Sequence, residues 1–389
     1  MRNPLSKVVV DIQPSGIRKF FDIVSEMKDA ISLGVGEPDF DTPWHIREEG
    51  IYSLEKGRTF YTSNAGLKDL KIEICNYLKR RYALNYECDH ETIVTIGGSE
   101  AIDIALRAML DPGDEVLIPQ PSYVSYLPCV SLAGGKPVII ELKAENQFRL
   151  TKEEVLAAVT EKTKVLIMPF PNNPTGAIME YEDLVDIVKV VIEKDLFVIS
   201  DEIYSELTYG QKHVSIAELP GMKERTILIN GFSKSYAMTG WRLGYAAAPR
   251  VILEQMLKIH QFAIMCAPTT SQYAAVAALR DGDKDVQVMR ESYDQRRRYL
   301  IHAFKEMGME CFEPHGAFYT FPSVKRFGMT SDEFATRLLR EEKVAVVPGT
   351  AFGDCGEGYL RISYAYSLKN LKEALSRMDR FVKKLDGKA

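Results

Sequence analysis

The chain lacks the features that mark several classes of protein. Its 389 residues include six cysteines without any C-x-x-C pair and six histidines without the spacing of zinc ligands. Scattered cysteines fit a reducing cytoplasm and do not suggest a disulfide framework. No apolar run approaches the roughly 20 residues of a membrane span, and the run at 8–10 is too short for a signal-peptide core. We therefore expect a cytoplasmic protein without a metal site.

A strong charge of either sign is also missing. The 49 basic and 54 acidic residues give a net charge of −5, with no basic patch and no acidic tail. Glu291 and Asp294 lie just before the three arginines at 296–298, which favours a solvated helix face over contact with nucleic acid. Neither a G-x-G-x-x-G nor a Walker A sequence occurs, so nucleotide sites lose their main support. We expect neither nucleic acid nor a membrane as a partner.

What the sequence does contain is a regular alternation of short apolar runs and helical patterns from about residue 90 onward. Helical patterns at 99–110, 152–159 and 180–194 separate several of the apolar runs. The alternation predicts an α/β fold, with a mostly parallel sheet covered by helices on both faces. The expected strands span residues 92–96, 115–118, 138–142, 165–168, 197–200, 226–229 and 244–247.

The two ends of the chain predict a second, smaller α+β domain. A long charged helix at 284–308 leads into a mixture of expected strands and helices. We expect residues 1–45 to contribute to this small domain, 46–285 to form the large domain, and 286–389 to form the rest of the small one. Further expected helices span 11–30, 44–56, 66–82, 331–342 and 368–385, and further expected strands span 316–321, 344–347 and 359–363.

Three polar clusters follow apolar runs of the large domain. Lys234 lies in a loop of small residues after the run 226–229; alone, it would be an ordinary surface lysine. The sequence Asn-Asn-Pro-Thr-Gly at 172–176 follows the run 165–170, and Asp-Glu-Ile-Tyr at 201–204 follows the run 196–199. Open α/β sheets bind ligands beyond the carboxyl ends of their strands. The clusters therefore predict one shared site.

The side chains of this site match the needs of pyridoxal phosphate. Lys234 is the candidate Schiff-base residue and general base, because its amine condenses with the aldehyde of that cofactor. Asp201 is the candidate partner of the ring nitrogen, and Asn173 and Tyr204 are the candidates for hydrogen bonds to the ring oxygen. A pair of surface acids at 201–202 and a plain turn at 172–176 are the alternative interpretations.

The expected phosphate site combines two parts of the chain. Gly98, Ser99 and Glu100 open the helix expected at 99–110, and a helix N-terminus favours an anion. N-capping by Ser99 is the alternative. Ser233 and Arg242 complete the site, since a guanidinium suits two-pronged contact with phosphate.

Two further residues extend the predicted site. Tyr123, after the strand expected at 115–118, is the candidate for stacking on the cofactor ring, with an ordinary packed aromatic as the alternative. Arg361 lies within an apolar strand, where arginine is seldom buried without an anion. We expect it to bind a substrate α-carboxylate, with a structural ion pair as the alternative.

In this order the motifs resemble those of the fold-type I, class I pyridoxal-phosphate aminotransferases. The resemblance implies a homodimer with shared active sites, in which Tyr61 reaches the neighbouring subunit's cofactor phosphate. It also implies that Gly36, Asn173 and Arg361 contact the substrate. Relatives often have serine where this chain has Gly231, so Ser233 is expected to carry more of the phosphate contact. The matching motifs lie at residues 34–40, 173–176, 200–204, 233–242 and 361–363.

Within the family, the chain is most similar to the branch of aromatic, aspartate and N-acetyl-diaminopimelate aminotransferases. The resemblance implies a ping-pong transfer of the amino group of an L-amino acid to a 2-oxo acid. A carbon–sulfur lyase or decarboxylase on the same scaffold is one alternative. Another is the aminotransferase-like sensor domain of a transcription regulator, which we do not favour because no basic helix-turn-helix precedes this region. The motifs do not predict which amino acid is used.

Overall fold

A seven-stranded sheet forms the centre of the structure, a computed structural model that describes residues 2–14, 27 and 29–387. The strand order is β2-β8-β7-β6-β5-β3-β4. β8 is antiparallel to both of its neighbours, and the remaining pairs are parallel. The expectation of an α/β fold with a mostly parallel sheet is confirmed. The strands are β2 (Thr92–Thr95), β3 (Glu115–Gln120), β4 (Lys136–Glu141), β5 (Thr163–Met168), β6 (Phe197–Asp201), β7 (Thr226–Gly231) and β8 (Gly244–Ala247).

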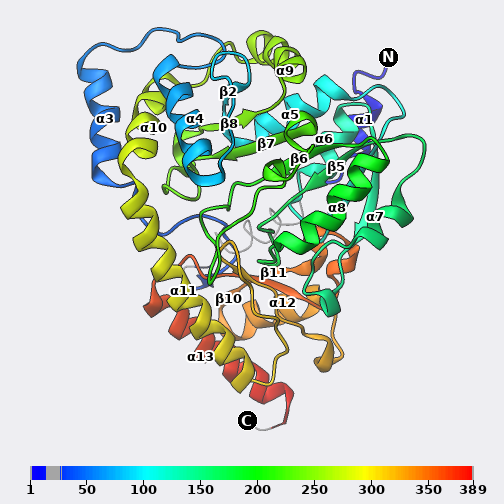
Figure 1. Ribbon diagram of the computed structural model, residues 1–389. Helices are drawn as coiled ribbons and strands as arrows, with labels where there is room; N and C mark the ends of the chain where they lie inside the picture. The colour runs from blue at the N-terminus through cyan, green and yellow to red at the C-terminus, as the bar shows by residue number, and fades with distance from the viewer. Residues whose placement is uncertain (1, 15–26, 28, 388–389) are drawn as a thin grey trace.

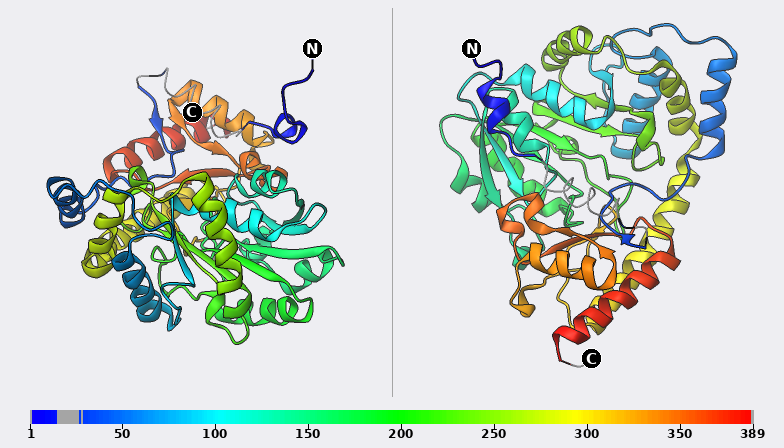
Figure 2. Two further views of the ribbon diagram at one scale, coloured as in Figure 1. Left: turned by 90° about the horizontal axis from the view of Figure 1, so that it is seen from above. Right: turned by 180° about the vertical axis from the view of Figure 1, so that it is seen from behind.

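Helices cover both faces of this sheet (Figures 1 and 2). Side chains alternate along β7: Ile227 and Ile229 share a core with one group of helices, and Leu228 shares a core with another. Burial on both faces explains why the strands are apolar runs and do not alternate with polar residues. One face carries α5 (Gly97–Met109), α6 (Tyr126–Leu132) and α9 (Arg250–Ala263); the other carries α4 (Lys68–Tyr82), α7 (Lys152–Ala158), α8 (Tyr181–Glu193) and α10 (Thr269–Asp281).

A smaller layer of C-terminal strands and helices lies below the large sheet in Figure 1. Its antiparallel sheet has the order β11-β12-β9, and β1 pairs with β10 in parallel beside it. Leu33, just after β1, belongs to the core of this layer. The elements are β1 (Ile31–Ser32), β9 (Tyr319–Thr320), β10 (Val344–Ala345), β11 (Val347–Pro348), β12 (Leu360–Ser363), α11 (Asp283–Glu306), α12 (Ser331–Glu342) and α13 (Leu368–Leu385).

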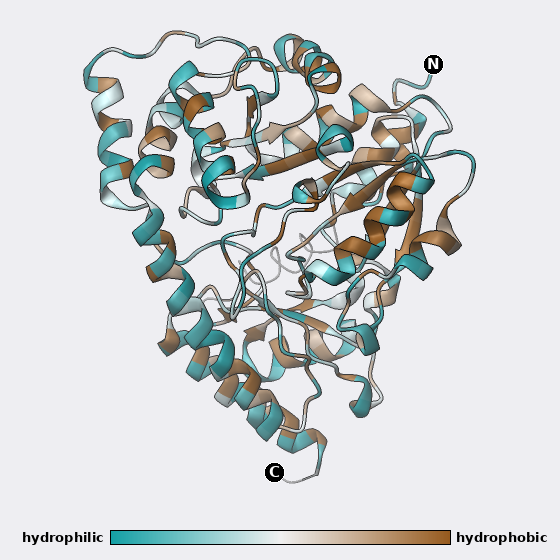
Figure 3. Ribbon diagram, in the orientation of Figure 1, coloured by the Kyte–Doolittle hydropathy of each residue, from teal (hydrophilic) through white to brown (hydrophobic). Residues whose placement is uncertain are grey.

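The long helix α11 connects the two layers and is largely hydrophilic on the outside (Figure 3). It contributes Val286 to a core beside the large sheet and Leu300 to the core of the small layer. The helix therefore takes part in both cores, and the division into domains 1–45, 46–285 and 286–389 stays a prediction.

Some elements differ from the sequence-based expectations. The strand expected at 316–321 shrinks to Tyr319–Thr320, because Ala317 takes a left-handed conformation with φ of 57°. Helices α6, α9 and α10 were not predicted; α10 is rich in alanine and has no clear apolar stripe. The helix expected at 11–30 lies mostly outside the described residues, and α1 (Lys7–Asp11) ends where it was expected to begin.

The described residues contain neither a membrane-spanning helix nor a cluster of metal ligands. None of the helices in residues 2–14, 27 and 29–387 combines the length and the apolar character needed to cross a membrane. In the same part of the chain, no three His, Cys, Asp or Glu side chains gather as a metal site. The remaining helix of the large layer, α3 (Trp44–Glu55), packs against α10.

Candidate active site

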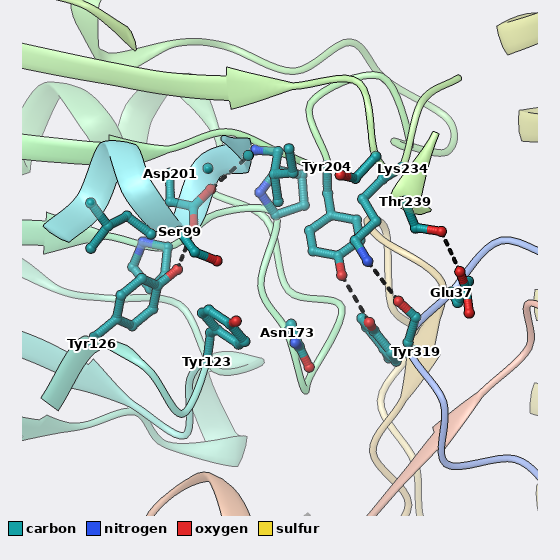
Figure 4. Close-up of a pocket in the computed structure, with 18 of the residues that line it drawn as sticks. Glu37, Ser99, Tyr123, Tyr126, Asn173, Asp201, Tyr204, Lys234, Thr239 and Tyr319 are labelled. Carbon is teal, nitrogen blue, oxygen red and sulfur yellow. Dashed lines mark hydrogen bonds between the residues drawn. The ribbon is translucent and has the colours of Figure 1, made fainter. Parts of the chain in front are cut away.

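A cavity of about 400 Å³ lies between the end of the large sheet and the small layer. Pockets of this size are typical of small-molecule sites. It brings together side chains from loops after β2, β3, β5, β6 and β7 and from the C-terminal strands (Figure 4). Its walls include most residues predicted from the sequence: Gly36, Gly98, Ser99, Tyr123, Asn173, Asp201, Tyr204, Ser233, Lys234, Arg242 and Arg361.

Lys234 extends into this cavity from the loop after β7. Its Nζ donates a hydrogen bond of 2.6 Å to the carbonyl oxygen of Gly36. Burial lowers the pKa of the Lys234 amine to about 8; Glu37 opposes this shift, and Arg361 and Arg242 contribute to it. Because a neutral amine is the nucleophilic form, this environment prepares Lys234 for condensation with an aldehyde.

Asp201 ends β6 and is buried, with its side chain fixed from two directions. The Tyr126 hydroxyl donates to Oδ2 at 2.7 Å, and the Ile203 backbone N–H donates to Oδ1 at 3.3 Å. Burial raises the pKa of the Asp201 carboxyl, whereas these two hydrogen bonds lower it. Such a carboxylate is suited to a cationic partner inside the cavity.

The alternative of a surface acid pair at 201–202 is not supported. Glu202 is fully buried and accepts hydrogen bonds from Ser200 Oγ at 2.8 Å and Ser215 Oγ at 2.7 Å. His213 Nε2 lies 2.9 Å from its other oxygen. Glu202 therefore has its own partners and leaves Asp201 as the acid of the cavity.

Arg361 is 3 % exposed and lines the same cavity from β12. Its Nη1 donates to Asn173 Oδ1 at 3.0 Å, and its Nη2 donates to the carbonyl oxygen of Gly34. The buried Nε has no partner among the described residues, and no acidic side chain pairs with the guanidinium there. The alternative of a structural ion pair therefore has no support, and an anion would satisfy the unused donor.

The loop at 172–176 is a turn as well as part of the site. Asn172 Oδ1 accepts hydrogen bonds from the backbone N–H of Thr175 at 3.1 Å and from its hydroxyl at 2.9 Å. This turn leaves Asn173 at the cavity wall, where it contacts Arg361. The two interpretations of the sequence are therefore compatible.

The opposite end of the cavity is built around the start of α5. A Cβ placed on Gly244 would lie 2.6 Å from the carbonyl carbon of Gly97 and 2.7 Å from the nitrogen of Gly98, so only glycine permits this approach of β8. The Arg242 guanidinium lies beside Gly97, and its Nη1 donates to Thr239 O at 3.0 Å. Helix N-terminus, guanidinium and hydroxyls together suit a phosphate.

Ser99 lies in the first turn of α5 and is exposed to the cavity. The N-cap residue of α5 is Ile96, so the alternative role of Ser99 as N-cap is not observed. Gly231, the departure from the family pattern, faces Gly244 and Leu243 closely instead of the cavity. Ser233 is thus the serine of this loop that lines the wall together with Lys234.

Two predicted cofactor residues are not part of the cavity wall. Glu100 turns away from it: one carboxylate oxygen accepts the Ile96 N–H at 2.6 Å, and the other lies 2.6 Å from His260 Nδ1. Glu100 therefore supports the start of α5 and is not placed to touch the phosphate. Tyr61 is 79 % exposed; its expected target lies in a second subunit, so its role stays a prediction.

Sequence reasoning missed two tyrosines that line the cavity. Tyr126 holds Asp201, and Tyr319 reaches from β9 to the Tyr204 hydroxyl at 2.8 Å. Tyr126 could have been found from its position three residues after Tyr123, at the exit of a buried strand. Nothing local marks Tyr319, because it comes from a part of the chain 115 residues away from Tyr204.

The residues present fit pyridoxal phosphate. The cavity offers an amine with a lowered pKa, a buried carboxylate, a tyrosine face at Tyr123 and an anion site at α5. Gly244 lets β8 approach the backbone at the start of α5 closely, and the buried Nε of Arg361 is a donor that a second anion would satisfy. A phosphate at one end and a carboxylate at the other are what a cofactor with its amino-acid substrate would supply.

Comparisons with known proteins identify the family of this chain. Residues 28–378 match the family described as "Aminotransferase class I and II". A protein of Bacillus subtilis named "Putative aminotransferase YugH" is 54% identical over 99% of this chain and 100% of its own length. Aspartate aminotransferase of Pyrococcus abyssi is 50% identical over 96% of each chain. The aromatic aminotransferase structure from Pyrococcus horikoshii has a TM-score of 0.90 at 48% identity, covering 94% of this chain and 99% of its own.

These relatives are aminotransferases, and none of them favours the lyase alternative. Their similarity extends over nearly the whole chain, so it includes the sheet, the small layer and every wall of the cavity. The chain therefore belongs to the class I and II aminotransferases, and it is a pyridoxal-phosphate-dependent transaminase.

Proposed function

We propose that this transaminase takes its nitrogen from an L-amino acid of the aromatic, aspartate or N-acetyl-diaminopimelate type and passes it to a 2-oxo acid in a ping-pong cycle. Amino acid and 2-oxo acid would use the cavity in turn. The observation that carries the proposal is Arg361, a buried guanidinium whose Nε has no partner among the described residues. An α-carboxylate, common to both substrates, would occupy it.

In this proposal each side chain has one task. Bound pyridoxal phosphate supplies an electron sink for charge that develops at the substrate α-carbon. Lys234 Nζ, with its pKa of about 8, removes and returns the proton at that carbon. Asp201 keeps a proton on the ring nitrogen, and Arg361 together with Asn173 orients the carboxylate.

The remaining predicted roles complete the cofactor site. Tyr204 directs its hydroxyl to the ring oxygen, and Tyr123 stacks on the ring. Ser99 and Gly98 at the start of α5, with Ser233 and Arg242, hold the phosphate. Gly36 lines the substrate side.

The cations of the cavity wall bear on the choice of donor. Among the described wall residues these are Lys234, Arg242 and Arg361, and all three have tasks in the proposal. A second substrate carboxylate would need a cation from outside this wall, whereas an aromatic side chain would need none. Aromatic donors therefore come first in the test, and aspartate is the direct competitor.

The test is a half-reaction screen. The cofactor-loaded enzyme is mixed with single amino acids, without a 2-oxo acid, and the loss of the visible absorbance of the cofactor is followed. We expect the aromatic amino acids or aspartate to react fastest, and Lys234→Ala to lose both the absorbance and nearly all turnover. Wild-type turnover in Lys234→Ala would overturn the site, and release of ammonia and pyruvate from cystathionine would overturn the transaminase cycle.

We also propose a homodimer with shared sites. Phe60, Tyr61 and Phe262 are 81 %, 79 % and 87 % exposed, which is unusual for aromatic side chains of a monomer. Mixed dimers of Lys234→Ala and Tyr61→Ala test it. If Tyr61 acts across the interface, one site of each mixed dimer contains both native residues and regains cofactor affinity and turnover. If the mixture stays as weak as its parents, Tyr61 does not act across the interface.

A further inference from the structure

The hydroxyls of Tyr204 and Tyr319 form an isolated pair beside Lys234 (Figure 4). Their oxygens are 2.8 Å apart, and the rings meet edge to face with centroids separated by 5.8 Å. Tyr204 is 5 % exposed and Tyr319 is 1 % exposed. Among the described residues, neither hydroxyl has another hydrogen-bond partner. One proton therefore joins the two oxygens, and the other remains available to the cavity.

The environment of the pair decides which tyrosine donates to the other. The Arg361 guanidinium lies over the Tyr319 ring, 4.7 Å from its centroid. Burial raises the pKa of both tyrosines, and at Tyr319 the Arg361 guanidinium opposes this rise most strongly. Tyr319 is the more acidic phenol and thus the better donor. With Tyr319 as the donor of the pair, the Tyr204 proton is left for the cavity.

We propose that Tyr319 is a positioning residue of this transaminase: its hydroxyl fixes the Tyr204 O–H toward the ring oxygen of the cofactor. This inference rests on the proposed role of Tyr204. A hydroxyl that accepts a hydrogen bond becomes a stronger donor itself. Tyr319 would therefore strengthen the bond from Tyr204 to a negatively charged ring oxygen and hold it in one direction.

The loop at Gly36 is shaped around the same hydroxyl. A Cβ built on Gly36 would overlap the Tyr319 oxygen, and it would lie 3.3 Å from the ring carbon that carries this oxygen. The Gly36 carbonyl also accepts the hydrogen bond from Lys234. Glycine at this position thus leaves space for the Tyr319 hydroxyl while the backbone holds the amine.

The main experiment measures the pH midpoint of the visible absorbance change of the cofactor-loaded enzyme. A negative ring oxygen is favoured by the Tyr204 donor, so weakening that donor moves the midpoint up. For Tyr319→Phe we expect an upward shift of about 0.3 to 1 pH unit and a pyridoxal-phosphate dissociation constant raised about 3- to 10-fold in titrations of the cofactor-free protein. Tyr204→Phe should shift the midpoint further, because it removes the donor altogether.

A double-mutant cycle separates positioning from general loosening. If Tyr319 acts through Tyr204, Tyr319→Phe adds no shift in the Tyr204→Phe background. The matched control is Tyr364→Phe, which loses a buried hydroxyl bonded to Ala317 O at 3.1 Å in the same core. We expect this control to leave the midpoint unchanged.

The outcomes are distinguishable. The positioning role is overturned if Tyr319→Phe has a wild-type midpoint. It is also overturned if Tyr319→Phe shifts the midpoint equally in the wild-type and Tyr204→Phe backgrounds. A wild-type midpoint in Tyr204→Phe overturns the proposed contact of Tyr204 itself. Packing is tested by thermal unfolding of the cofactor-free protein. Gly36→Ala should reduce the stability clearly less in the Tyr319→Phe background than in the wild-type background. An equal cost in both backgrounds would show that the Tyr319 hydroxyl does not require glycine at position 36.

Discussion

The hydrogen bond from Tyr126 to Asp201 should contribute more to the free energy of unfolding at neutral pH than at acidic pH. Tyr126→Phe removes a hydrogen-bond donor that lies 2.7 Å from a buried carboxylate oxygen. Because Tyr126 is itself buried, the substitution leaves the protein surface unchanged. A hydrogen bond to a charged group contributes about 1.5–3 kcal/mol, against about 0.5–1.5 kcal/mol for a neutral pair. The loss of the bond therefore destabilises the charged form by about 1–1.5 kcal/mol more than the neutral form, which raises the pKa of Asp201 further.

The pH dependence follows from the direction of this shift. Burial already raises the pKa of Asp201 above its ordinary value, so the folded protein holds this proton more tightly than the unfolded chain. The contribution of Asp201 to stability therefore falls as pH rises through its folded pKa, and Tyr126 limits that fall. Tyr126→Phe should lower the free energy of unfolding most at neutral pH. This loss of stability should shrink by about half as Asp201 becomes protonated.

The assay is urea unfolding of the cofactor-free protein over a range of pH. The matched control is Tyr245→Phe, because the buried Tyr245 hydroxyl has no partner among the described residues. This control should be close to wild type at every pH. A Tyr126→Phe cost that is independent of pH, or no larger than that of Tyr245→Phe, would refute the argument that the bond serves a charged Asp201.

Three further predictions concern cofactor binding and substrate binding. Uptake of pyridoxal phosphate by the cofactor-free protein should accelerate as pH rises through about 8, because the neutral Lys234 amine is the nucleophile; a flat stopped-flow profile between pH 7 and 9 would contradict it. Arg361→Lys should raise KM for both substrates about 100-fold, equivalent to about 2.7 kcal/mol, because one ammonium replaces a two-pronged guanidinium; steady-state kinetics with unchanged KM would exclude the carboxylate contact. His260→Leu should raise the pyridoxal-phosphate dissociation constant about 3- to 10-fold with little change in turnover at saturating cofactor, because Glu100 loses the partner that helps it hold the start of α5; unchanged affinity in fluorescence titrations would show that the pair does not support the phosphate site.

The sequence alone determined the fold class and predicted the central residues of the candidate site. Strands buried on both faces must be apolar throughout, so the seven strands of the sheet were visible as runs. Polar residues that interrupt such runs lie at strand ends, and this local rule was enough to select Lys234, Asp201, Asn173 and Tyr204. The tertiary structure places all four in the wall of one cavity.

Local patterns were less informative where burial comes from distant contacts. Helix α10 contains alanines that pack against α3 and α4, and such small residues give no apolar stripe. The strand expected at 316–321 failed because Ala317 and its neighbours follow the surface of Leu207 and Tyr209, with the Ala317 N–H bonded to Leu207 O at 2.8 Å. Neither set of contacts can be predicted from the residues of the segment alone.

The hydrogen-bond partners of the candidate site residues were decided by the tertiary structure alone. A carboxylate in sequence can face a ligand or support a helix, and only packing shows that Glu100 turns to His260 while Asp201 enters the cavity. Tyr319 meets Tyr204 across 115 residues of chain. The ends of the strands can be predicted from the sequence because they depend on residues adjacent in the chain. Hydrogen-bond partners cannot, because they depend on where segments distant in the sequence meet in the fold.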